Sequence, residues 1–128
     1  MRDDAEAIWT AAMAAVEPER LVAARLSLDG AGRLCHDGRP LEPTLSLEHV
    51  DRIIVVGAGK AAAGMAAGIA RLLGPDGLAR HRVTGLVSVP AGCGRRLGSI
   101  EVRETRPAKA NLPTPAVVQA THEIMASV

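Results

Sequence analysis

The pattern of apolar and polar residues along the chain predicts an α/β fold. Residues 53–56 are consecutive β-branched residues, a pattern typical of a strand that is buried on both faces. An Ala-rich segment at 60–73 predicts a helix that ends in the Gly-Pro-Asp-Gly of residues 74–77. Further strands are expected at 83–89 and 100–103, and a last helix follows them. This order predicts the start of a Rossmann-like parallel sheet with helices on both faces.

Two local signals refine the predicted helices. Thr114 is a candidate cap of the last helix, with Pro115 at its first position. Gly64 and Gly68 are four residues apart in the Ala-rich helix, and this spacing of small residues predicts that the helix packs closely on the sheet.

Residues 1–45 show a different pattern, that of helices followed by an irregular connector. Asp3 or Asp4 is a candidate cap of a first helix, and Pro18 suits the first position of a second one. The apolar positions with helical spacing are Ile8, Trp9, Ala12, Met13 and Val16. Turn signals between residues 27 and 43 predict a small hairpin or an extended connector. We therefore divide the chain into N-terminal helices and a connector (1–45) and a partial Rossmann-like α/β domain (46–128).

The predicted sheet is small for a fold of this class. About three parallel strands are expected, whereas a mean sheet has about five or six. The last helix runs into Val128 without a Gly, Asn or Pro that would end it. We expect the sequence to be the N-terminal part of a longer chain, and the alternative is a small compact domain with a frayed C-terminus.

Composition narrows the class of protein. The formal net charge is +1, which gives no attraction to nucleic acid or to an anionic membrane. Trp9 is the sole aromatic residue, so a platform for stacking bases is excluded. The two cysteines, Cys35 and Cys93, form no CxxC pair, which disfavours a zinc site or a disulfide scaffold and favours a cytoplasmic protein. No apolar run is long enough for a membrane span or a secretory signal.

The segment from Gly57 to Ala62 fits the pattern G-x-G-x-x-[GA] between a buried strand and a helix. The first glycine permits a tight turn, and Gly59 lets the backbone, including that of Ala58, approach a bound anion. The second strand ends without an acidic residue that could hold a ribose, which disfavours NAD or FAD, and no Walker A loop is present. Gly57, Ala58 and Gly59 are therefore candidates for binding a substrate or phosphate anion.

Lys60 is the candidate catalytic residue. A cation in the first turn of a helix opposes the helix dipole, at a cost of about 0.3–1 kcal/mol. This placement makes sense if the amine shares an anion with the N–H groups of the turn, where it can neutralise a phosphoryl oxygen or a carboxylate. The alternative is a surface lysine on a structural turn.

The residues of this region resemble a known family. The segment 54–66, IVVGAGKAAAGMA, resembles the signature of the glycerate 2-kinases of the MOFRL-associated type. Residues 16–22 and 85–90 are similar to other parts of that family. The resemblance implies a kinase that uses ATP and Mg²⁺ to phosphorylate the 2-hydroxyl of D-glycerate or a related hydroxy acid. It also implies that Lys60 contacts the substrate or the transferred phosphate.

The resemblance further implies an active site between an N-terminal Rossmann-like domain and a C-terminal domain. The partners expected are then a small-molecule substrate and the C-terminal domain of the same chain, and a homodimer stays open. Residues 1–128 alone are expected to be inactive.

The sequence departs from the family in the loop after the third strand. Many members carry a His-Pro-x-Pro-Asp segment there, whereas residues 106–114 contain no histidine. Arg106, Lys109 and Asn111 enter this loop at the carboxyl end of a strand and can bind a carboxylate or phosphate, the alternative being a solvated basic loop. Arg95 and Arg96, in the glycine-rich loop 91–98, are weaker candidates for the same role.

Three other interpretations remain. A phosphosugar-binding module resembling the SIS domains of sugar isomerases has a similar turn, but Ala61 stands where a serine would hold the phosphate. A dinucleotide-binding oxidoreductase domain lacks its ribose-binding acid. The last is a truncated and inactive relic that folds poorly by itself.

Overall fold

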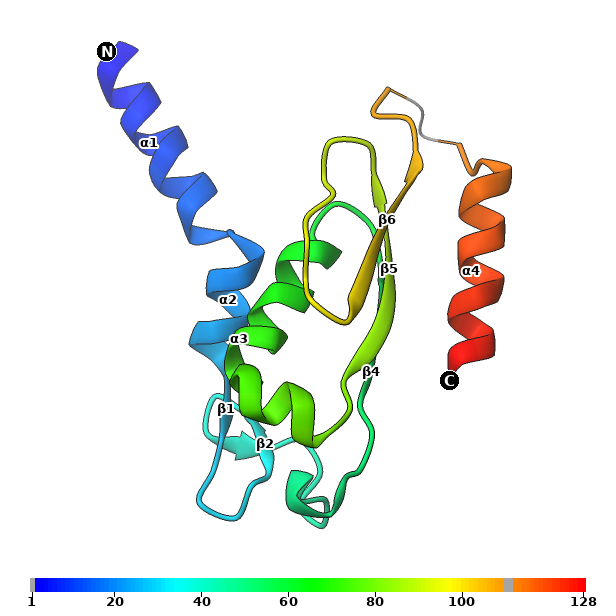
Figure 1. The fold of residues 1–128 in the computed structure, drawn as a ribbon. Helices are drawn as coiled ribbons and strands as arrows, with labels where there is room; N and C mark the ends of the chain where they lie inside the picture. Colours follow the sequence, from blue (N-terminus) through cyan, green and yellow to red (C-terminus); the bar gives the residue numbers. More distant parts are fainter. Residues whose placement is uncertain (1, 110–111) are drawn as a thin grey trace.

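The computed structural model describes residues 2–109 and 112–128, which form an α/β structure with helices at its N-terminus (Figure 1). The N-terminal part contains α1 (Arg2–Ala15), α2 (Pro18–Arg25) and a small antiparallel sheet of β1 (Leu26–Leu28), β2 (Leu34–His36) and β3 (Arg39–Pro40). A 3-10 turn (Leu47–His49) leads into β4 (Ile54–Ala58), α3 (Ala62–Arg80), β5 (Thr84–Pro90), β6 (Ile100–Arg106) and α4 (Pro115–Ser127).

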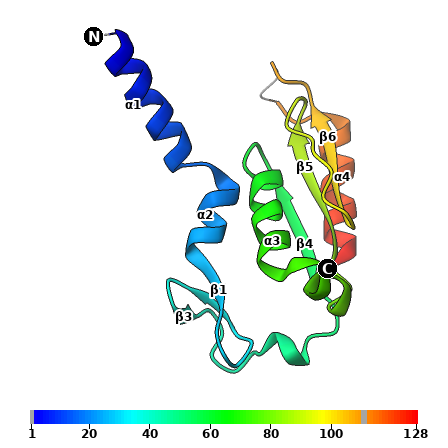
Figure 2. The ribbon, with the colours of Figure 1, turned by 60° about the vertical axis from the view of Figure 1, so that its left-hand side comes forward.

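The second part is a parallel sheet with the strand order β4-β5-β6. Helix α3 packs on β4 and β5 from one face, and α4 packs on β5 and β6 from the other (Figure 2). The buried core on the α3 side consists of small and branched side chains: Ala63, Ala66, Val83, Val87, Val89 and Ile100. The predicted α/β class, with helices on both faces of a parallel sheet, is confirmed.

Strand β4 is not buried on both faces, so that prediction from its β-branched run is wrong. Among the described strands β4 pairs with β5 alone, its residues are half-buried or exposed, and Val56 is 41% exposed. The reason is the position of α4, which covers β5 and β6 and leaves the same face of β4 uncovered. Burial of this strand therefore depends on neighbours, which its own sequence does not specify.

The two glycines of α3 pack on α2 and not on the sheet, contrary to the sequence prediction. A Cβ added to Gly64 would lie 3.0 Å from Cβ of Pro18, and one added to Gly68 would lie 2.5 Å from Cβ of Val22. The absence of side chains at these positions lets the two helices approach closely. The second predicted helix is confirmed, with Glu17 as its cap and Pro18 at its first position.

Helix α3 differs from the prediction at both ends. It begins at Ala62, so Lys60 precedes the helix and does not stand in its first turn. At its other end, Gly74 adopts φ 65° and ψ 174°, and the chain resumes a helix at Pro75 that ends at Arg80. The predicted stop is thus a kink, because glycine allows the left-handed backbone and proline suits the start of a new helix.

Helix α1 projects from the rest of the molecule (Figures 1 and 2). Every one of its described residues is exposed, including Ile8 at 71% and Trp9 at 66%. The predicted apolar face is therefore present, but it packs against nothing within the described residues. Among the described residues, 2–109 and 112–128, no helix combines the length and apolar character needed to cross a membrane.

Candidate functional site

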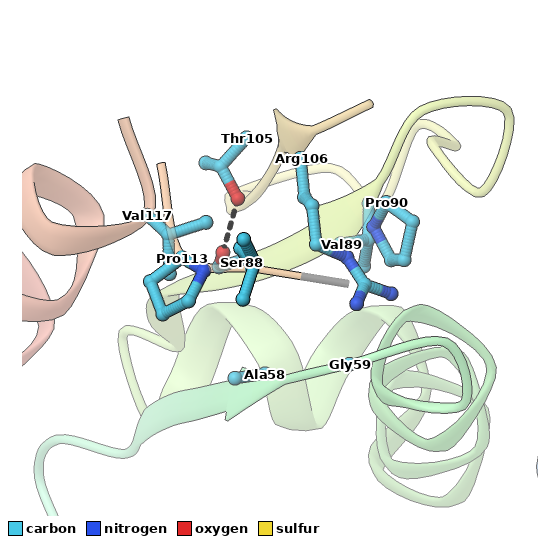
Figure 3. A pocket seen from close by; sticks show the side chains of 10 residues that line it. Ala58, Gly59, Ser88, Val89, Pro90, Thr105, Arg106, Pro113 and Val117 are labelled. Carbon is cyan, nitrogen blue, oxygen red and sulfur yellow. Dashed lines mark hydrogen bonds between the residues drawn. The ribbon is translucent and has the colours of Figure 1, made fainter. Parts of the chain in front are cut away.

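A cavity of about 250 Å³ opens at the carboxyl ends of the parallel strands (Figure 3). Open α/β sheets bind their ligands at this edge. Each strand contributes its last residues to the wall, and the start of α4 closes one side. The lining residues are Ala58, Gly59, Ser88, Val89, Pro90, Thr105, Arg106, Leu112, Pro113 and Val117.

The glycine turn after β4 forms one wall of the cavity. Gly59 has φ +106°, a conformation that L side chains rarely adopt, and its N–H donates to the carbonyl of Ser88 at 2.9 Å. The N–H groups of Lys60 and Ala61 donate to no group among the described residues. Gly57 lies where an added Cβ would be 3.3 Å from Cβ of Ala62, so it permits the close approach of α3. The N–H groups of Lys60 and Ala61 are therefore available to an anion.

Lys60 follows Gly59 directly, and its side chain is exposed. It is not among the lining residues of the cavity, and it forms no ion pair with any described residue. The structure thus places a cationic side chain next to the cavity wall, and no carboxylate of the described chain neutralises it.

Arg106 is the sequence-predicted basic residue that the structure brings to the cavity. It is the last residue of β6, and its side chain extends toward the turn at Gly59 (Figure 3). Asn111, the other candidate of this loop, lies outside the described residues. Lys109 is exposed and lines no part of the cavity.

The glycine-rich loop after β5 is occupied by the chain's own groups. One oxygen of Glu104, Oε1, accepts the N–H of Gly92 at 3.0 Å and the N–H of Gly94 at 2.9 Å. Arg95 forms an ion pair with Glu19 of α2 at 3.0 Å, and Arg96 is exposed outside the cavity wall. This loop therefore links β6 to α2, and the structure does not bring Arg95 or Arg96 to the cavity.

Two buried hydroxyls at the cavity were missed by sequence reasoning. Ser88 and Thr105 are 7% and 6% exposed, and their oxygens lie 2.7 Å apart between β5 and β6 (Figure 3). Thr105 also accepts a hydrogen bond at its carbonyl from the hydroxyl of Thr114, at 2.7 Å. That second bond ties the cap of α4 to the end of β6. The available signal was a lone serine between two valines, Val87 and Val89, in the predicted strand.

Charged side chains hold α4 against β6 beside this region. Hydrogen bonds from Gln119 and then from Arg103 keep the pKa of Glu123 below its usual value. Arg103 also pairs with Glu101, and the two carboxylates raise the pKa of its guanidinium. These pairs fasten the helix whose first turn closes the cavity.

The site suits a small ligand. Drug-sized ligands occupy clefts of roughly 300–1,000 Å³, so the volume of this cavity, about 250 Å³, is suited to a smaller ligand. The described residues contain no cluster of His, Cys, Asp and Glu that could hold a metal ion.

Comparison with known proteins relates the chain to one family. The sequence model described as "Domain of unknown function (DUF4147)" matches residues 4–128. Neither a curated protein nor a solved structure matches the chain.

Proposed function

The chain belongs to the DUF4147 family, and from this membership we propose that it is the N-terminal part of an ATP-dependent glycerate 2-kinase. Domains of this family typically stand at the N-terminus of glycerate kinases of the MOFRL type. The proposed reaction transfers the terminal phosphoryl group of ATP to the 2-hydroxyl of D-glycerate or a related hydroxy acid. The products are ADP, the phosphorylated acid and the proton of that hydroxyl.

The observation that carries the proposal is the cavity between the Gly59 turn and Arg106. It lies where parallel sheets bind ligands, and its volume of about 250 Å³ suits a three-carbon acid. Of the described residues that line it, Arg106 is basic and none is acidic. A planar guanidinium matches a carboxylate with parallel N–H donors, so Arg106 binds the carboxylate of the substrate.

The turn supplies the groups that stabilise the transferred phosphoryl group. The N–H groups of Lys60 and Ala61 are available to its oxygens, and the Lys60 amine neutralises charge that spreads over them. ATP supplies the phosphoryl group when it is bound, and we assign its contacts to the C-terminal domain. No step is assigned to Mg²⁺ on the described residues.

A kinase assay tests this proposal in the protein that carries the chain together with its C-terminal domain. With ATP and D-glycerate, ³¹P NMR should show a phosphorylated glycerate. Lys60→Ala should lower kcat by about 10²–10³-fold, the loss typical of removing one group that stabilises transition-state charge. Arg80→Ala, an exposed cation at the other end of α3, serves as the matched control and should retain activity.

Unchanged turnover in Lys60→Ala would refute its assigned role. Binding of a sugar phosphate without any use of ATP would refute the kinase and favour the SIS-like module.

A further inference from the structure

The hydrogen bond between the buried hydroxyls of Ser88 and Thr105 uses only one of their two O–H donors. A serine or threonine hydroxyl carries one O–H donor and two acceptor lone pairs. The single hydrogen bond between Ser88 and Thr105, at 2.7 Å, consumes one of their two hydrogens. Neither hydroxyl oxygen has another hydrogen-bond partner within the described residues. One O–H is therefore left without an acceptor in a place that is more than nine-tenths buried.

A buried donor without an acceptor is energetically costly. Both Ser88 and Thr105 line the cavity. An acceptor atom of a ligand in the cavity would satisfy the remaining O–H. The hydroxyl pair is thus a second polar feature of the same cavity, independent of the glycine turn.

The backbone holds this pair in place from several sides. Val89 pairs with Glu104 and Pro90 pairs with Arg106, so Thr105 is an extra residue at an irregularity of the ladder. Irregularities of this kind re-aim side chains and recur next to active sites.

Two hydrogen bonds fasten the backbone of the pair. The Thr105 carbonyl accepts the hydroxyl of Thr114, and the Ser88 carbonyl accepts the N–H of Gly59 at 2.9 Å. The donor is consequently fixed before a ligand binds, which lowers the entropic cost of binding.

The rest of the lining indicates which acceptor fits. The cavity combines this donor with the cationic Arg106, and the described lining residues include no carboxylate. Val89, Pro90 and Val117 add apolar wall that can contact carbon atoms. A carboxylate with a short carbon chain satisfies all three features, whereas a phosphate satisfies the polar ones alone.

We propose that the Ser88–Thr105 pair donates the hydrogen bond that recognises a carboxylate oxygen of a small hydroxy acid in this cavity. The inference rests on the proposed function for the place of the substrate, and it adds two residues that determine specificity.

Titrations of the protein that carries the chain together with its C-terminal domain, followed by NMR, test the inference, with sodium D-glycerate and inorganic phosphate as separate probes. The double variant Ser88→Ala, Thr105→Val removes both hydroxyls and replaces them by apolar groups of similar shape, a change that leaves stability nearly unaltered in favourable cases. We expect it to weaken D-glycerate binding by about 10-fold or more. The matched control is Thr121→Val, Ser127→Ala, which removes the same groups from α4 outside the cavity and should bind as wild type.

The outcomes separate this inference from the proposed function. Wild-type affinity for D-glycerate in the double variant would overturn the role of the hydroxyl pair and leave the kinase proposal intact. Tighter binding of phosphate than of D-glycerate would overturn the carboxylate as ligand. Wild-type protein that binds neither anion would overturn both the inference and the substrate site of the proposed function.

The single variants keep the test decisive if thermal unfolding shows that the double variant does not fold. The hydroxyl that faces the ligand must then be either Ser88 or Thr105. At least one of Ser88→Ala and Thr105→Val should bind D-glycerate more weakly than wild type, and wild-type affinity in both would overturn the inference.

Discussion

Gly59 and Gly30 are a matched pair that separates backbone conformation from steric space. A Cβ added at either residue would meet no atom within 4 Å. Gly59 has φ +106°, whereas Gly30 lies outside the range of positive φ that disfavours side chains. Alanine at Gly59 therefore clashes with nothing, and any loss of stability comes from the backbone alone.

The expected magnitudes follow from that difference. A non-glycine residue held in a sparsely populated conformation costs about 1–3 kcal/mol. At a compatible position, alanine in place of glycine stabilises by about 0.4–1 kcal/mol, because it restricts the unfolded chain. Because the effect on the unfolded chain is the same in both variants, the free energies of unfolding of Gly59→Ala and Gly30→Ala should differ by the backbone strain alone, about 1–3 kcal/mol.

Urea denaturation measures this difference through the midpoint and the slope m. Gly59→Ala should lower the midpoint, and Gly30→Ala should leave it unchanged or raise it, both with an unaltered slope. An unchanged midpoint in Gly59→Ala would show that the turn adopts another conformation in solution. The hydrogen bond of 2.9 Å from the N–H of Gly59 to the carbonyl of Ser88 depends on this conformation, and without it the turn would not form the cavity wall.

Two further predictions concern the packing of the helices. Gly68→Ala should lower the thermal midpoint, because the new Cβ would lie 2.5 Å from Cβ of Val22. Overpacking of this kind costs about 1–3 kcal/mol, which exceeds the gain from the better helix propensity of alanine. An unchanged midpoint would mean that α2 does not pack on α3 in this way. The pKa of Glu123 is held below its usual 4.5 by Gln119 and Arg103, so its contribution to stability is present above pH 4.5 and is lost as the pH falls through the lowered pKa. Urea midpoints measured from pH 7 to pH 3 should therefore fall less for Glu123→Gln than for wild type, and parallel curves would contradict this linkage.

The local sequence predicted the glycine turn and Arg106 of the candidate site, but not the pairing of Ser88 with Thr105. The turn from Gly57 to Gly59 is local, since Gly59 is needed by the backbone of the turn and Gly57 by the approach of Ala62, five residues along the chain. Arg106 was found because residues after a parallel strand meet at one edge of the sheet. Ser88 and Thr105 are 17 residues apart and only the register of β5 against β6 brings them together, so no local signal could pair them.

The sequence by itself determined the elements, their order and the α/β class, because hydrophobic periodicity, capping residues and turn glycines act over a few residues. Tertiary structure decided everything that depends on which surfaces meet. In the folded chain α4 packs on β5 and β6 but not on β4, and Gly68 lies against Val22 of α2. The carboxylate of Glu104 accepts hydrogen bonds from the backbone of the glycine-rich loop. Burial, close packing and pairing of polar groups arise between segments that are distant in the sequence, and only the folded chain specifies those neighbours.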